Sequence, residues 1–124
     1  AIPDNSYHPR AIVKGFEAVD LTIQKQIVHH LNQFDIRIGD VFIVVEEMDL
    51  VLLIKKIRAL GLEIGKDVGI LSYNESPLKE VLADGISVIS TNFETMGKTC
   101  ANMIRSHSKQ RVENPFRLIE RKSF

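Results

Sequence analysis

The sequence has one cysteine, no excess of either charge and no long apolar run. Cys100 alone cannot form a disulfide within the chain, so nothing indicates adaptation to an oxidising compartment, and a cytoplasmic location is expected. The 16 basic residues balance the 16 acidic residues. A formal net charge of zero provides no electrostatic surface for nucleic acid or for a membrane, so we expect no direct DNA binding by this chain.

No stretch reaches the roughly 18 to 20 consecutive apolar residues of a membrane span. The opening residues, AIPDNSYHPR, have no apolar core of the signal-peptide kind. Their polar, proline-rich character is typical of a fragment of something longer, and residues 1–9 are expected to be poorly ordered. The 124 residues, of which 44% are hydrophobic and 26% charged, suit one compact domain and are too few for two.

Apolar periodicity predicts helices that alternate with short strands. The first strand, VFIVV, is apolar throughout and is expected to be buried on both faces. This alternation predicts an α/β domain built around a parallel sheet with flanking helices, with the last strand at an edge. The predicted strands are residues 41–45, 68–72, 86–90 and 115–121, and the predicted helices are residues 10–19, 20–34, 50–60, 77–82 and 92–107.

Polar residues and glycines mark the predicted helix ends. Ser76 is a suitable N-cap, and Pro77 suits the first position of the helix that follows. The other predicted signals are N-caps at Asp20 and Asp49, a capping box of Thr91 with Glu94, and a C-cap at Gly61.

Two loops with clustered polar residues follow predicted strands, at the carboxyl ends where parallel sheets bind ligands. Glu46 and Glu47 follow the first strand, and residues 73–75 (Tyr-Asn-Glu) follow the second. Adjacent carboxylates on an extended segment point in opposite directions, so we expect at most one to face a ligand. Glu46 is favoured for this position and Glu47 is expected to be solvated, whereas Tyr73 is expected to pack against the domain.

Signals for catalysis and for metal binding are missing. The sequence contains no G-x-S-x-G motif, no glycine-rich phosphate loop and no cysteine with a histidine nearby. Glu46 and Glu75 could form a carboxylate pair for glycoside chemistry, but no other feature supports it. The adjacent His29 and His30 would lie about 100° apart on a helix and could not easily converge on one ion. We therefore expect no enzyme, no metal and no cofactor.

The segment GLEIGKDVGILSYNESPLKEVLADGISVISTNFETMGKTCANMI resembles the C-terminal subdomain of LacI/GalR-type effector-binding domains, and the ending PFRLIERKSF resembles the last strand of that family. The resemblance covers residues 39–124 and implies a periplasmic-binding-protein-like, Rossmann-like lobe. The segments EEMDLVLLIKK and SYNESPLKEVLADGISVIST are more similar still to regulators in which the sensor domain follows a GntR-type winged helix. Such regulators are common in Bacteroides-like bacteria.

The resemblance implies a ligand-sensing transcriptional regulator, commonly responsive to a sugar, without its DNA-binding domain. Residues 10–124 would form the C-terminal lobe, and operator DNA would be a partner of the parent protein only. The helix at 92–107 would cross to a second lobe, and the effector would lie between the lobes. Two alternatives stay open: a lobe of a solute-binding protein for sugar transport and a small carboxylate-dependent enzyme.

The resemblance also indicates ligand contacts. Asn74 matches an aspartate that binds effector hydroxyls, and an amide both donates and accepts, although Asn74 also suits a tight turn. Glu75 could share this role or stabilise the next helix N-terminus. Glu46 matches a polar pair that lines the same cleft. Phe93 matches an aromatic that stacks on a sugar, although a phenylalanine there is more often part of a core.

The predicted helix at 92–107 carries an apolar stripe that would normally pack in the second lobe. Exposing it would forgo about 1.5 to 3 kcal/mol for each of its larger side chains. We therefore expect the chain to self-associate, through this helix or by exchanging it between copies. The stripe consists of Phe93, Met96, Cys100, Met103 and Ile104.

Overall fold

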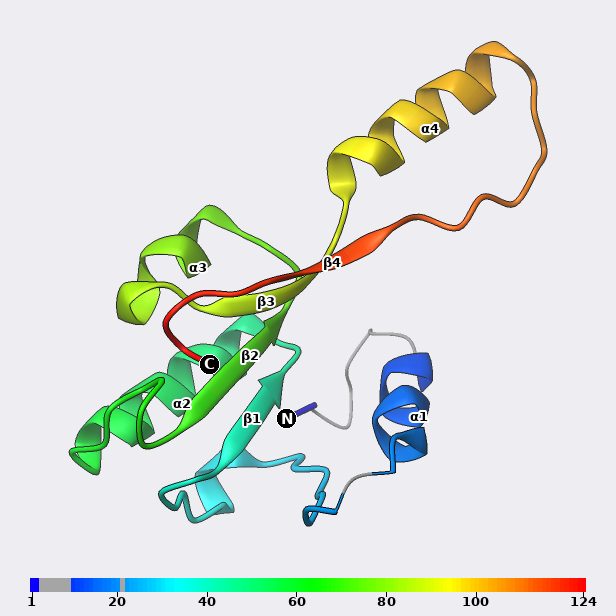
Figure 1. Ribbon diagram of the computed structural model, residues 1–124. Coiled ribbons are helices and arrows are strands. Elements are labelled where there is room, and N and C mark those ends of the chain that lie inside the picture. The colour runs from blue at the N-terminus through cyan, green and yellow to red at the C-terminus, as the bar shows by residue number, and fades with distance from the viewer. Residues whose placement is uncertain (3–9, 21) are drawn as a thin grey trace.

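The computed structural model describes residues 1–2, 10–20 and 22–124. At its centre is a four-stranded sheet with the order β1-β2-β3-β4 (Figure 1). β1 pairs with β2 and β2 with β3 in parallel, whereas β4 is an antiparallel edge strand beside β3. The predicted α/β fold around a parallel sheet is therefore confirmed. The strands are β1 (Val41–Val44), β2 (Gly69–Tyr73), β3 (Ser87–Thr91) and β4 (Phe116–Ile119).

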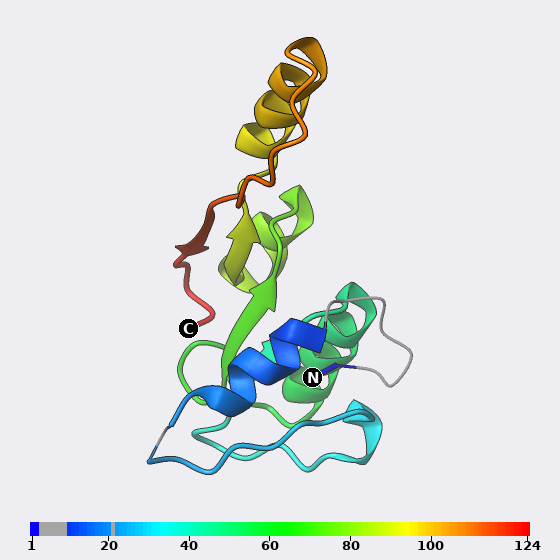
Figure 2. The ribbon, with the colours of Figure 1, turned by 90° about the vertical axis from the view of Figure 1, so that its right-hand side faces the viewer.

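One face of the sheet is covered by helices. Figure 2 shows α2 (Glu47–Ala59) and α3 (Pro77–Val81) on the same side of the strands. The core lies between this face and α2, which contributes Leu50, Leu53 and Ile57. The sheet contributes to the same cluster Phe42, Val44, Ile70 and Val88.

The opposite face of β1 is not covered. Phe42 and Val44 are buried, whereas Val41 and Ile43, which point the other way, are exposed. The prediction that this strand is buried on both faces is wrong, because the described helices that pack on the sheet lie on one side of it. Ile43 pairs with Leu71 in the parallel register, so the two side chains point to the same side of the sheet, although Leu71 is buried.

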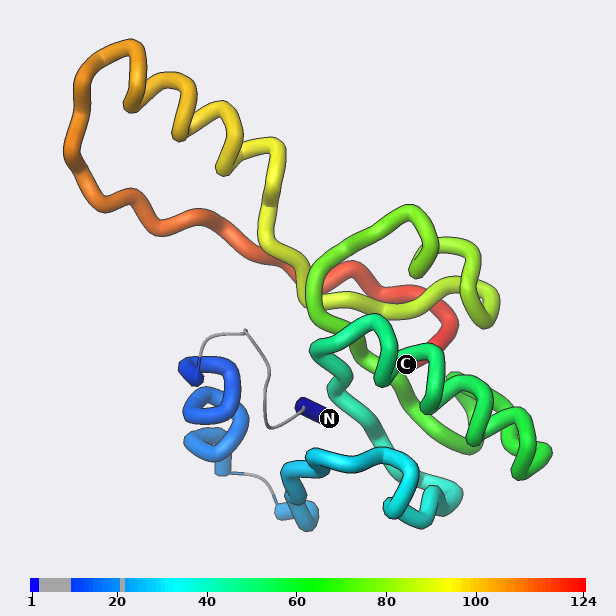
Figure 3. The backbone as a smooth tube through the Cα atoms, turned by 180° about the vertical axis from the view of Figure 1, so that it is seen from behind, coloured from blue at the N-terminus to red at the C-terminus, as the bar shows by residue number. Residues whose placement is uncertain are grey.

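The helix predicted for residues 20–34 is not formed. Residues 22–30 are irregular, and a single 3₁₀ turn, η1 (Leu31–Gln33), follows them. Lys56 of α2 donates hydrogen bonds from Nζ to the carbonyl oxygens of Leu31 and Asn32, at 3.1 and 3.3 Å. Those carbonyl groups are therefore satisfied from outside the segment, whose β-branched residues also disfavour a helix. The first helix, α1 (Arg10–Ala18), is formed as predicted and lies outside the sheet near the N-terminus (Figure 3).

Two of the predicted helix starts are wrong. α2 has Glu46 as its N-cap, so Asp49 lies within the first turn and does not cap it. α4 (Phe93–Arg105) is capped by Asn92, whose Oδ1 accepts from the Thr95 N–H at 2.9 Å, in place of the expected Thr91 capping box.

The N-cap predicted at Asp20 is also wrong, because the described residues 22–30 that follow it form no helix, whereas the signals at residues 61, 76 and 77 agree with the structure. Ser76 is the N-cap of α3 and Pro77 its first residue. Gly61 follows α2 with φ at +71°, the left-handed conformation that a C-terminal glycine permits. The expectation of poor order for the N-terminal residues concerns mainly residues 3–9, which lie outside the described ranges. Ile2, which is described, donates a backbone hydrogen bond to Val28 at 3.1 Å.

α4 and residues 106–115 project from the sheet as an arm, and β4 returns along β3 (Figure 1). The chain then ends against the amino ends of β2 and β3. The Ser123 hydroxyl, which is fully buried, donates to the Ile70 carbonyl oxygen and accepts from the Ser87 N–H, both at 2.7 Å. These bonds attach the C-terminal segment to the sheet at the edge opposite the polar loops.

Gly65 permits the close approach of this C-terminal segment. A Cβ atom on Gly65 would lie 1.8 Å from the backbone oxygen of Lys122, and its φ is +82°. We expect Gly65→Ala to lower the free energy of unfolding by at least about 2 kcal/mol, because clash and left-handed strain add. Gly97→Ala is the matched control: a Cβ on this α4 residue meets nothing within 4 Å. Urea denaturation of both variants tests this, and equal stabilities would contradict it.

Candidate ligand-binding site

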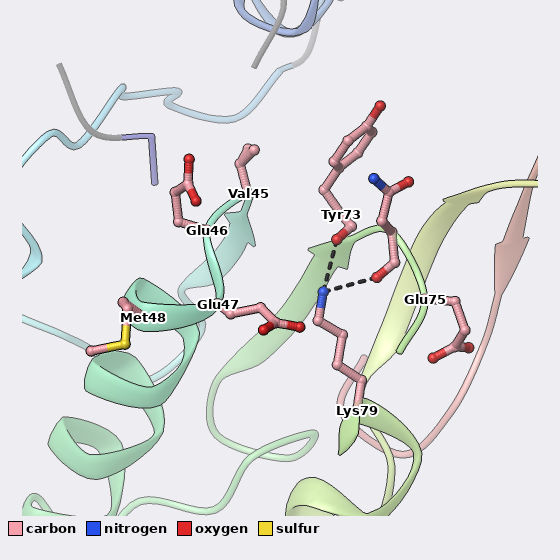
Figure 4. A pocket seen from close by; sticks show the side chains of 8 residues that line it. Val45, Glu46, Glu47, Met48, Tyr73, Glu75 and Lys79 are labelled. Atoms are coloured by element: carbon pink, nitrogen blue, oxygen red, sulfur yellow. Dashed lines mark hydrogen bonds between the residues drawn. The ribbon is translucent and has the colours of Figure 1, made fainter. Parts of the chain in front are cut away.

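A cavity of about 290 Å³ lies at the carboxyl ends of β1 and β2 (Figure 4). Parallel pairing brings these two strand ends to one edge, so the loops that follow them face each other across the cavity. Of the predicted ligand residues, Glu46, Asn74 and Glu75 are brought together here, and Phe93 is not. The lining residues are Val45, Glu46, Glu47, Met48, Tyr73, Asn74, Glu75 and Lys79.

Glu46 and Glu47 both line the cavity, although at most one was expected to face it. The expectation assumed an extended segment. Glu46 is extended, with φ −94° and ψ 140°, but Glu47 is the first residue of α2, so the alternation is lost between them. In Figure 4 the Glu47 carboxylate points toward the Lys79 amine, and Glu46 points away from it.

Asn74 has the geometry of a turn residue with a polar side chain at the strand edge. Its φ is +60°, a left-handed conformation that asparagine tolerates better than most residues. Its N–H donates to the Ile89 carbonyl oxygen at 2.8 Å, and its Oδ1 accepts from the Thr91 N–H at 3.3 Å. The side-chain amide therefore joins the ends of β2 and β3, and both readings of Asn74, turn and ligand contact, fit this position.

Glu75 is engaged by groups of the protein itself. Its Oε2 lies 2.6 Å from Arg121 Nη2 in a partly buried ion pair, and its Oε1 accepts from the Ser76 N–H at 2.9 Å. Its own N–H donates to Ser90 Oγ at 3.0 Å. The contact with the Ser76 N–H, at the start of α3, agrees with the helix-stabilising alternative for Glu75.

Phe93 and Tyr73 are placed differently from expectation. Phe93 begins α4, is 48% exposed and does not line the cavity. Tyr73, which was expected to pack, lines the cavity as the last residue of β2.

Lys79 is a lining residue that sequence reasoning missed. It is 3% exposed, and its Nζ donates to the carbonyl oxygens of Tyr73 and Asn74, both at 2.8 Å. Helical side chains lean toward the helix N-terminus. A lysine in the short α3, which begins just after a polar strand-end loop, was therefore the available signal.

The charge state of Lys79 reflects its surroundings. Burial lowers the pKa of its ammonium group below the ordinary value of 10.5, and the negative charges of Glu47 and Glu75 partly oppose that shift. The charged amine is stabilised locally by two charge-assisted hydrogen bonds to carbonyl oxygens.

Within residues 1–2, 10–20 and 22–124, no group of three or more metal-ligating side chains comes together. The helical argument against a metal at His29 and His30 no longer applies, because residues 22–30 are not helical. His29 instead places Nδ1 3.0 Å from the Ile2 carbonyl oxygen. None of the described helices is long and apolar enough to cross a membrane.

Comparison with known families supports the fold. The family model described as "Periplasmic binding protein-like domain" matches residues 8–124. The chain belongs to this family. A comparison with curated proteins found no match.

Solved structures of regulators resemble this periplasmic binding protein-like domain. A protein of Staphylococcus saprophyticus subsp. saprophyticus, described as a transcription regulator, is 27% identical with a TM-score of 0.53, over 68% of this chain and 32% of that one. The lactose repressor bound to the anti-inducer ONPF is 18% identical with a TM-score of 0.57, over 69% of this chain and 34% of the repressor. The Lac repressor bound to ONPG is 17% identical with a TM-score of 0.57, over 70% of this chain and 28% of the repressor. The matched region is about a third of each neighbour's length, and the GntR-type context stays a prediction.

The lowered pKa of Lys79 predicts a pH dependence of stability. The folded chain holds the Lys79 proton less tightly than the unfolded chain, so the unfolded state binds more protons between the lowered pKa and 10.5. The free energy of unfolding should therefore rise across this window, as the pH increases, relative to that of Lys79→Met.

Urea denaturation at several pH values up to 10.5 measures this difference. Lys55→Met, which removes an exposed lysine of α2, is the matched control and should follow the unmodified chain. Equal pH slopes for the unmodified chain and Lys79→Met would show that Lys79 has no such shift.

Proposed function

We propose that residues 10–124 are the C-terminal lobe of the effector-sensing domain of a bacterial transcription regulator, and that the cavity binds a sugar or sugar derivative. The observation that carries this proposal is the cavity itself, at the carboxyl ends of β1 and β2, with polar side chains from both loops. Family membership and the regulator neighbours support it.

The proposed parent is a cytoplasmic regulator of a Bacteroides-like bacterium, with a GntR-type winged helix before the sensor. That winged helix would bind operator DNA, whereas this chain has no net charge to do so. The effector would close a cleft between this lobe and a second one, and the closed state would change how the two winged helices of a dimer fit their half-sites. The arm of α4 suits the crossing element, since none of its residues is buried.

The two alternatives have less support. A lobe of a solute-binding transport protein would share the fold, but the neighbours described above are regulators. A carboxylate-dependent enzyme would need Glu46 and Glu75 as a reactive pair. Both oxygens of the Glu75 carboxylate are already held, one by Arg121 and the other by the Ser76 N–H.

Asn74 variants separate the turn role from the ligand role. Glycine accepts the +60° φ of Asn74 without strain, so Asn74→Gly should keep the stability within about 1 kcal/mol. If the amide contacts the effector, the same variant should lose about tenfold or more in affinity, as expected for one lost hydrogen bond in a dry site. Asn74→Asp keeps the acceptor oxygen and removes the amide donors.

The measurement is a titration followed by backbone amide NMR shifts, which detects weak binding, with D-glucose, D-galactose, D-xylose and L-arabinose. Equal affinity in the unmodified chain and Asn74→Gly would remove Asn74 from the ligand contacts. If none of these sugars moves the signals of residues at the cavity, the sugar-sensing proposal is wrong.

We also propose that the chain self-associates through the apolar stripe of α4. Phe93, Met96 and Ile104 lie on one side of this helix and are 48%, 39% and 77% exposed. Covering these side chains in a second copy would recover the hydrophobic free energy that exposure forgoes.

Light scattering after size-exclusion chromatography tests this proposal. The unmodified chain should be dimeric or larger, and Ile104→Glu should shift it toward the monomer. Asn102→Glu places the same charge on the opposite side of α4, about 160° away, and should leave the mass unchanged. A monomeric unmodified chain would count against self-association.

A further inference from the structure

The Lys79 amine, at the cavity wall, has more N–H donors than it has acceptors among the described residues. An ammonium group carries three N–H donors. Within the described part of the chain, its hydrogen-bond acceptors are two, the Tyr73 and Asn74 carbonyl oxygens at 2.8 Å. These bonds also fix the direction of the amine, because Lys79 is buried and the two carbonyls belong to the last residue of β2 and the residue that follows it. One N–H is thus left for a ligand.

Glu47 faces this amine from the other loop. Its carboxylate points toward Lys79 Nζ in Figure 4, and it contributes to the electrostatic environment of that amine. Among the described residues, the ion pairs do not include one between Glu47 and Lys79, so the two groups are apart. A donor and an acceptor that face each other across a gap match a hydroxyl group, which both accepts and donates.

The same residues disfavour an acidic ligand. Arg121 is paired with Glu75 at 2.6 Å, and Lys79 is bonded to two carbonyl oxygens. Lys79 is the single cation among the lining residues, whereas Glu46, Glu47 and Glu75 all carry carboxylates, so the lining has an excess of negative charge. Glu47, whose side chain is exposed at the cavity, would repel such a group.

We propose that Lys79 and Glu47 set the ligand class of this cavity. Lys79 donates to a ligand hydroxyl oxygen, the hydroxyl donates to Glu47, and the pair selects uncharged, hydroxyl-bearing ligands over sugar acids. The proposal rests on the ligand-sensing function proposed above and assigns its specificity to two residues that the family resemblance did not indicate.

Matched sugars test this selection on the unmodified chain. D-glucose and D-glucuronate differ at one carbon, as do D-galactose and D-galacturonate. The affinities are measured by amide NMR titration at constant ionic strength. At least one neutral sugar is expected to bind about tenfold or more tightly than its acid, a factor that corresponds to about 1.4 kcal/mol.

Two variants assign the selection to the pair. Glu47→Gln keeps the shape and removes the charge, and should reduce the preference for the neutral sugar to about threefold or less. Lys79→Met keeps the length of the side chain and removes its N–H donors, and should lower the affinity for the neutral sugar about tenfold or more. The controls are Glu63→Gln and Lys55→Met, which change exposed residues away from the cavity lining and should leave both affinities unchanged.

The ratio of the affinities for the neutral sugar and for its acid distinguishes a specificity role from a structural one. A variant that only loosened the loop would weaken the binding of both sugars alike. If Lys79→Met does not fold, Glu47→Gln still tests the selection. An acid that binds as tightly as its neutral partner would overturn the assignment and leave the sensing function standing. If none of the neutral sugars D-glucose, D-galactose, D-xylose and L-arabinose binds, the sensing function itself is wrong.

Discussion

The parallel pairing of β1 with β2 is the constraint on which the candidate site depends. Val41 to Val44 pair in register with Gly69 to Ser72, so both strands end at the same edge of the sheet. Each strand is followed within a few residues by the start of a helix. The polar residues between strand and helix are thereby brought together from two distant parts of the chain, which no local interaction could achieve. A shift in this register would separate Glu47 from Lys79.

The two ends of the sheet differ in how they are closed. At the amino end the C-terminal segment packs tightly, with a buried Ser123 hydroxyl and a glycine at its closest approach. At the carboxyl end a cavity remains, with carboxylates, an amide and one buried amine at its wall. The proposed ligand site therefore lies at the end that the C-terminal segment leaves open. Arg121 links the two ends, because it follows β4 and still reaches Glu75.

The exposed apolar surface of this chain is consistent with the proposed place in a two-lobed sensor. The open face of β1 and the stripe of α4 lack a covering layer within the described residues, and the matched region is about a third of each structural neighbour. Apolar surfaces of this kind mark interaction sites. The hydrophobic effect would favour covering such surfaces, whether by a second lobe or by a second copy of the chain.

The sequence by itself determined the α/β class and most element positions, because apolar runs and N- and C-terminal signals such as Pro77 and Gly61 act locally. It also indicated the two polar loops, because parallel strands end at a common edge. Periodicity failed for residues 22–30, where the carbonyl groups of the following turn are bonded by Lys56 of a distant helix. Only the tertiary structure decided which polar groups the protein itself engages. Glu75 is held by Arg121, 46 residues away, and Lys79 is buried against a strand end, and such pairings depend on distances that sequence spacing does not record.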